Sequence, residues 1–295
     1  MRIALTLLLA LSAVACAAPQ PTFDGDRAFA DLARQVQFGP RIPGSGGHLQ
    51  CVEWIIAQLR PLADSVWTQP FRGVILGRSD TVAMMNIIAR FNPDAGERIL
   101  LSAHWDTRPH ADFDPDSTLR AQPIAGANDG ASGVAVLLEL ARLFDSMPPP
   151  IGVDLAFYDG EDSGDYGDSP GRWCQGSFHF AARLPARYRW AINVDMIGDK
   201  DLTIPIEANS YRLAPELVDR VWSQAEKLGE TAFQRARGSD VFDDHMPLLA
   251  KGITAINIID FDYPHWHTTH DTIDKCAPAS LTAVGRVLVG VVYDL

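Results

Sequence analysis

Histidines and acidic residues stand directly after several apolar segments in the middle of the chain. A single acid in such a place commonly caps a helix or begins a turn. Several of them converging on one edge of a sheet bring carboxylates together, and these repel one another unless a cation lies between them. The residues concerned are His104 and Asp106 after segment 98–103, Asp159, Glu161 and Asp162 after segment 153–158, Asp195 after segment 191–194, Asp260 and His267 after segment 253–259, and Asp129 at the start of a helix.

These residue types indicate which metal the cluster would hold. Imidazole and carboxylate ligands without a thiolate suit zinc in a catalytic role, where three protein ligands leave one coordination position open. Glu161 and Asp162 are neighbours on a turn after a predicted strand. One of them can therefore bind the metal while the other stays free as a general base.

The elements that must position these residues alternate between strands and helices. We expect one α/β domain with a central mixed, largely parallel sheet covered by helices on both faces. In such a sheet the site lies outside the carboxyl ends of the strands. Hydrophobic periodicity predicts strands at 65–76, 81–91, 98–104, 153–158, 190–196 and 253–259, and helices at 26–37, 48–62, 130–144, 175–183, 214–228 and 280–295.

Composition excludes some classes of protein. The chain has 295 residues, of which 47% are hydrophobic, and a formal net charge of −12. A chain of this kind forms a large core and is not disordered. The acidic balance argues against a nucleic-acid-binding protein, which needs a basic face.

The N-terminus predicts export. Residues 1–15 have the charged start, apolar run and small residues of a signal peptide, and residues 16–24 are expected to form a tether before a catalytic domain at 25–295. The run ending at Cys16 resembles a bacterial lipoprotein cleavage box, so we expect a periplasmic or outer-membrane lipoprotein; ordinary signal cleavage nearby is the alternative. Beyond Cys16 the cysteines are Cys51, Cys174 and Cys276, and a bridge between Cys51 and Cys276 stays open.

An ordered set of segments resembles the M28 family of zinc aminopeptidases and, within it, the glutaminyl cyclases, especially the bacterial ones. One departure is the pair Glu161-Asp162, where many members of the family have two glutamates. The segments are AHWDTRPHAD from Ala103, GANDGASGV from Gly126, FYDGED from Phe157, WCQGS from Trp173, NVDMIG from Asn193, DDHMPLL from Asp243 and WHTTHDT from Trp266.

The resemblance implies one zinc ion bound by Asp129, Asp162 and His267, with Glu161 as the general acid and base. His104 and Asp195 match positions that hold a second zinc in the di-zinc aminopeptidases.

In the cyclases these two positions are retained but one zinc is used. There Asp195 joins a hydrogen-bond network that Asp243 completes, and Tyr263 and Trp266 match aromatic residues of the substrate pocket.

The implied reaction converts the N-terminal glutamine of peptides or proteins to pyroglutamate and releases ammonia. The rival reading is a di-zinc aminopeptidase that hydrolyses N-terminal residues. A third hypothesis is a non-catalytic binding protein on the same fold. Such a protein would lack one of the metal ligands or the general base. Glu161 and the full ligand set are present. The expected partners are peptides or proteins with N-terminal glutamine. We expect no binding to nucleic acid, and contact with a membrane only through a lipid anchor at Cys16.

Overall fold

A six-stranded sheet forms the centre of the molecule in the computed structural model, which describes residues 21–166 and 172–294. The strand order is β1-β2-β4-β3-β5-β8. β2 runs antiparallel to both of its neighbours, whereas the other adjacent pairs are parallel. The strands are β1 (Ser65–Gly73), β2 (Val82–Phe91), β3 (Arg98–His104), β4 (Gly152–Tyr158), β5 (Ala191–Asp195) and β8 (Ala255–Ile259).

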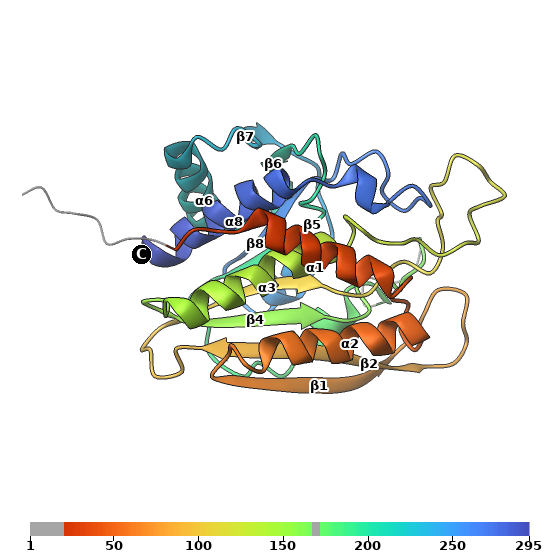
Figure 1. Cartoon of the computed structure of the whole chain (residues 1–295), viewed down its shortest axis with the longest axis horizontal. Coiled ribbons are helices and arrows are strands. Elements are labelled where there is room, and N and C mark those ends of the chain that lie inside the picture. Colours follow the sequence, from red (N-terminus) through yellow and green to blue (C-terminus); the bar gives the residue numbers. More distant parts are fainter. Residues whose placement is uncertain (1–20, 167–171, 295) are drawn as a thin grey trace, which may run out of the picture.

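Helices cover both faces of this sheet, which confirms the predicted fold class. On one face α1 (Gly25–Gln37), α3 (Ala131–Ser146) and α8 (Pro278–Tyr293) lie side by side (Figure 1). α2 (Gly46–Leu59) and α6 (Pro215–Leu228) extend that layer, and its side chains share the largest hydrophobic cluster. The other face carries the short helices α4 (Gln175–Ala181) and α7 (His245–Ala250). Every residue of β3 and β4 is buried, as expected for parallel strands covered on both sides.

The parallel strands bring the predicted acidic edge together. His104 at the end of β3 pairs in register with Tyr158 at the end of β4. Asp195 at the end of β5 pairs with Ile259 at the end of β8. The loops that follow these strands therefore start on one side of the molecule.

Several short elements were not predicted from the sequence. β6 (Ile204–Ile206) and β7 (Phe233–Arg237) form a separate two-stranded sheet, and α5 (Ala208–Leu213) follows β6. α7 and a 3₁₀ turn at Ile273–Lys275 were also missed. β6, α5 and α7 are too short to complete a clear hydrophobic period, and β7 is exposed at all but its first residue.

The domain begins slightly earlier than predicted. Phe23 is buried against Gly285 of α8, and Asp24 accepts a hydrogen bond from the Arg27 amide as the N-cap of α1. Both residues, placed in the tether by the sequence, thus belong to the folded domain. The predicted signal peptide and Cys16 lie outside the described residues. Within the described ranges, none of the helices combines the length and apolarity that a membrane span needs.

The remaining cysteines are buried and unpaired. Cys51, Cys174 and Cys276 all have free thiols in the structure. A bridge between Cys51 and Cys276 is therefore not formed.

Candidate active site

The three predicted zinc ligands meet at the carboxyl ends of the parallel strands. Asp129 stands just before α3, Asp162 follows β4 and His267 follows β8. Nε2 of His267 lies 3.1 Å from Oδ1 of Asp162 and 3.5 Å from Oδ2 of Asp129. One ligand atom from each residue lies within 4.8 Å of the other two, a spacing at which one ion contacts all three.

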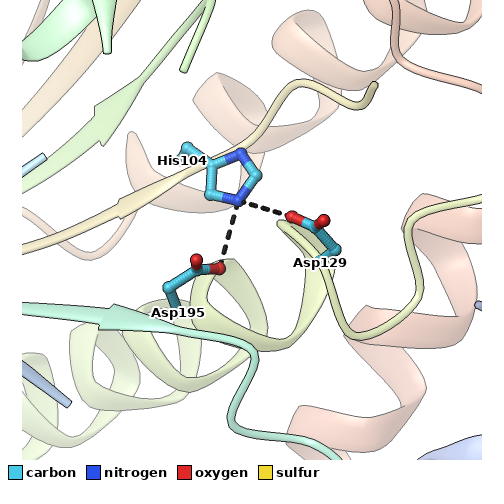
Figure 2. A group of neighbouring side chains, drawn as sticks. All are labelled: His104, Asp129 and Asp195. Atoms are coloured by element: carbon cyan, nitrogen blue, oxygen red, sulfur yellow. Dashed lines mark hydrogen bonds and ion pairs between the residues drawn. The ribbon is translucent and has the colours of Figure 1, made fainter. Parts of the chain in front are cut away.

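A second group of three shares Asp129 with the first (Figure 2). Nε2 of His104 lies 3.1 Å from Oδ1 of Asp129 and 3.2 Å from Oδ1 of Asp195. The two oxygens of Asp129 thus face different histidines. This arrangement suits either a bridging carboxylate between two metals or one metal beside a hydrogen-bonded histidine.

Backbone amides hold the ligand-bearing turns in place. The Asp271 carboxylate accepts from the amides of Asn128 at 2.9 Å and Asp129 at 3.1 Å. In the same way, the Asp106 carboxylate accepts from the amides of Glu161 at 3.1 Å and Asp162 at 3.3 Å. Two acids near the site therefore orient the loops and are not themselves among the grouped ligands.

Gly130 and Arg41 also shape the turn before α3. Gly130 has a φ of 95°, and a Cβ there would come within 2.7 Å of the Asp106 carbonyl oxygen. The buried guanidinium of Arg41 donates to the carbonyls of Ala125 at 2.9 Å and Gly126 at 2.7 Å. Arg41 thus holds the chain before Asp129, and Gly130 permits the tight turn after it.

The donor set fits a zinc ion. Oδ2 of Asp129 and both oxygens of Asp162 are buried and have no hydrogen-bond donor among the described residues, although Nε2 of His267 lies close. Buried carboxylate oxygens without donors are costly unless a cation satisfies them. Burial, followed by the neighbouring Asp162, raises the pKa of Asp129 to about 7. Burial alone would also raise the pKa of Asp162, but His267 and Arg108 lower it to about 2.

Glu161 is buried beside these ligands and belongs to neither zinc group. Its carboxylate lies with Asp243 and the Cys174 thiol in a third cluster, whose atoms are all within 4.8 Å of one another. Burial raises the pKa of Glu161 well above its usual range; His104 opposes this, and Asp162 and Asp243 add to it. Its position suits a group that exchanges protons with a molecule bound to the metal.

Asp243 is fixed by two buried amides. Oδ2 of Asp243 accepts from Nδ2 of Asn193 at 3.2 Å and from Nδ2 of Asn257 at 2.5 Å. These asparagines lie on β5 and β8. Burial, followed by the charge of Asp195, raises the pKa of Asp243 to about 6. Asp243 therefore lies beside Glu161 as the predicted network requires, whereas Asp195 is hydrogen-bonded to His104.

A cavity of about 360 Å³ opens onto the ligands, and its walls are formed mainly by acidic and aromatic side chains. Trp266 lines it and stacks on Phe113 with ring centroids 4.9 Å apart. Tyr263 is placed differently from the prediction, because it is absent from the lining and its hydroxyl donates to Oδ1 of Asp271 at 2.9 Å. The lining consists of Asp129, Glu161, Asp162, Tyr166, Trp173, Asp195, Met196, Asp240, Val241, Phe242, Asp243, Ile259, Phe261, Trp266 and His267.

Two acids of the predicted edge lie outside the site. Asp159 is paired with His48, whose Nε2 lies 2.9 Å from Oδ2 of Asp159. Asp260 accepts from the amide of Thr203 at 2.9 Å. Both follow strands of the sheet, so strand position alone did not separate them from the ligands.

Sequence reasoning missed several residues of the site. Tyr166, whose hydroxyl lies 2.9 Å from Nδ1 of His267, sits in a loop with no periodic signal. Trp173, Phe242 and Phe261 line the cavity from separate segments of the chain. Only the WCQGS and DDHMPLL segments pointed to the neighbourhoods of Trp173 and Phe242.

Comparison with protein families identifies the family to which the chain belongs. The model of Peptidase family M28 matches residues 86–292, which include every ligand candidate. The chain belongs to peptidase family M28.

Three solved structures resemble this member of the M28 family. The glutaminyl cyclase of Bacteroides thetaiotaomicron, bound to N-acetylhistamine, has a TM-score of 0.90 at 35% identity and covers 94% of this chain and 100% of its own. A leucine aminopeptidase precursor from the same species has a TM-score of 0.91 at 35% identity, covering 95% and 100%. A Zn-dependent exopeptidase from Parabacteroides distasonis has a TM-score of 0.90 at 34% identity, covering 94% and 100%.

These similarities support a zinc enzyme of the M28 and glutaminyl cyclase group. They do not separate cyclisation from hydrolysis, because structures named for each activity match equally well.

Proposed function

We propose that this chain is a glutaminyl-peptide cyclotransferase that uses one zinc ion and acts on peptides or proteins with N-terminal glutamine. The observation that carries this proposal is the position of Asp243. Its carboxylate lies beside Glu161 at a cavity with acidic and aromatic walls, held by Asn193 and Asn257. Both reactions need a group that takes up a proton and returns it to a leaving nitrogen, so Glu161 suits either of them. Asp243 beside Glu161 is the feature that favours cyclisation, because it matches the aspartate that completes the acid network in the cyclases that this chain resembles.

The cavity suits a glutamine side chain. Trp266, Phe261 and Tyr166 supply flat apolar walls for its methylene groups, and the acids gather near the metal ligands. Because the attacking amine and the amide belong to the same residue, the enzyme needs mainly to hold them in reacting geometry.

Asp129, Asp162 and His267 would hold the zinc ion, which would supply a Lewis acid that polarises the γ-carboxamide. Glu161 takes the proton that the α-amino nitrogen loses as it bonds to the carbonyl carbon (Cδ) of the side-chain carboxamide. Glu161 then delivers this proton to the amide nitrogen as its bond to that carbon breaks, and ammonia leaves. Asp243 lies beside Glu161 and would help to orient it, whereas Asp195 would hold the imidazole of His104.

A di-zinc aminopeptidase is the second candidate function. The observation that favours it is the triad of His104, Asp129 and Asp195, which is intact and shares Asp129 with the first triad. In that case Glu161 acts as the base for the water that attacks the scissile carbonyl. Two zinc ions per chain would be expected.

One experiment separates the two functions. The purified chain is incubated with a peptide that begins with glutamine and with a matched peptide that begins with leucine. We expect ammonia and an N-terminal pyroglutamate from the first peptide, no cleavage of the second, and one zinc per chain by elemental analysis. Release of free N-terminal residues together with two zinc ions would establish the aminopeptidase instead.

A further inference from the structure

We propose that Cys174 is a positioning residue whose thiol holds the Glu161 carboxylate in its reacting orientation. This inference rests on the role of Glu161 under the proposed function, although Glu161 exchanges protons in the aminopeptidase reaction as well. Sγ of Cys174 lies 3.3 Å from Oε1 of Glu161 and donates a hydrogen bond to it. A carboxylate side chain has several rotamers, and this bond selects among them.

The backbone at Cys174 is hydrogen-bonded to the turn that carries Glu161. The Cys174 amide donates to the Glu161 carbonyl at 2.9 Å, and the Gln175 amide donates to the Gly160 carbonyl at 3.1 Å. The start of α4 is thereby tied to the turn after β4. The thiol is presented to Glu161 from a fixed support.

The backbone conformation of Cys174 points to a role for its side chain. Its φ of 52° and ψ of 33° lie in the left-handed region, which disfavours residues with a Cβ and which glycine adopts freely. Glycine would therefore satisfy the turn better than cysteine. The contact that cysteine adds there is the bond to Glu161.

Ser177 and Asp244 support the backbone at Cys174. The Ser177 hydroxyl lies 3.0 Å from the Cys174 carbonyl oxygen and 2.5 Å from Oδ1 of Asp244. Cys174 is fully buried and is not part of the cavity lining, so it reaches a substrate only through Glu161. Burial raises the pKa of its thiol well above the usual range, which keeps the sulfur protonated as a donor.

Three variants of one position test this role. Cys174→Gly removes the thiol and relieves the backbone, Cys174→Ala removes the thiol and keeps the Cβ, and Cys174→Ser keeps a donor. We expect kcat to fall about 10-fold in the glycine and alanine variants and to stay within about 3-fold of the wild type in the serine variant. KM, zinc content and the circular dichroism spectrum should change little in all three.

Wild-type kcat in a folded, zinc-loaded glycine or alanine variant would overturn the inference. So would a serine variant as slow as the glycine variant. If the glycine variant fails to fold, the kcat of the alanine variant shows whether loss of the thiol slows the reaction. The assay follows whichever product the wild type forms, pyroglutamate or free N-terminal residues. A wild type that only hydrolyses would refute the cyclase proposal and leave the comparison at Cys174 intact.

Discussion

The Tyr166 hydroxyl lies 2.9 Å from Nδ1 of His267, on the ring nitrogen opposite to the one that faces Asp129 and Asp162. If Nε2 bound the zinc ion, Nδ1 would carry the ring proton and would donate a hydrogen bond to the phenol oxygen. Such outer contacts fix the orientation of a metal-binding imidazole. Tyr166 thus links the wall of the cavity to the coordination of the metal.

Tyr166→Phe should therefore weaken zinc binding by roughly 10-fold, at the low end of the range for losing an outer partner of a ligand. Competition with a chelator of known affinity measures this change. Tyr211→Phe is the matched control, because Tyr211 is an exposed tyrosine on α5 that is absent from the cavity lining. Equal zinc affinity in both variants would contradict the assigned contact.

Trp266 and Tyr263 offer a second comparison, since both were predicted in the pocket and only Trp266 lines it. Trp266→Leu should raise KM for a glutamine peptide about 10-fold by removing a flat apolar wall. Tyr263→Phe should leave KM near the wild-type value and cost about 1 kcal/mol of stability through the lost bond to Asp271. Steady-state kinetics and thermal unfolding of both variants measure these effects. A larger rise in KM for Tyr263→Phe than for Trp266→Leu would reverse the assignment.

The sequence predicted the sheet well because its strands are strongly patterned. The buried runs of β3 and β4 are mostly apolar and are followed by polar residues, and the predicted boundaries differ from the structure by at most one residue at each end. Parallel neighbours then place His104, Glu161, Asp162 and Asp195 at one edge. The metal-binding group was therefore predictable from strand ends and motif order.

The walls of the cavity were not predictable in the same way. Tyr166, Phe242 and Phe261 stand in irregular segments, where the side-chain direction depends on tertiary contacts and not on periodicity. Tyr263 shows the converse limit. It lies three residues before Trp266, yet its hydroxyl is bonded to Asp271 and it does not line the cavity. A motif fixes which residues are near a site, but not which of them face it.

We propose that the protein is exported and lipid-anchored at the bacterial envelope, because the run ending at Cys16 resembles a lipoprotein cleavage box. Lipidation adds more than one acyl chain, which stable anchoring requires. We expect the wild type in the membrane fraction and Cys16→Ser in a soluble or unprocessed form. Cell fractionation with immunoblotting distinguishes them, and Cys51→Ser serves as the control because Cys51 is buried in the folded domain. A wild type that is already wholly soluble would rule out the anchor.

The neighbours Glu161 and Asp162 are predicted to have separate roles, and two isosteric variants distinguish them. Asp162→Asn should weaken zinc binding, because a neutral amide is a poorer zinc ligand than a carboxylate, and added zinc should restore part of the activity. Glu161→Gln should keep its zinc and its fold, because Glu161 belongs to neither zinc-binding triad. Its activity should nevertheless fall roughly 10²–10⁴-fold, the range for losing general acid and base catalysis.

Zinc content, thermal unfolding and turnover of a glutamine peptide are measured for both variants in the same buffer, with and without added zinc. The expected pattern is a zinc-loaded but inactive Glu161→Gln and a zinc-poor Asp162→Asn that responds to zinc. The two substitutions remove the same charge from adjacent positions, so a difference between them reflects coordination and not net charge. Loss of zinc from Glu161→Gln would show that Glu161 is itself a ligand and would refute its assignment as the proton-transferring group.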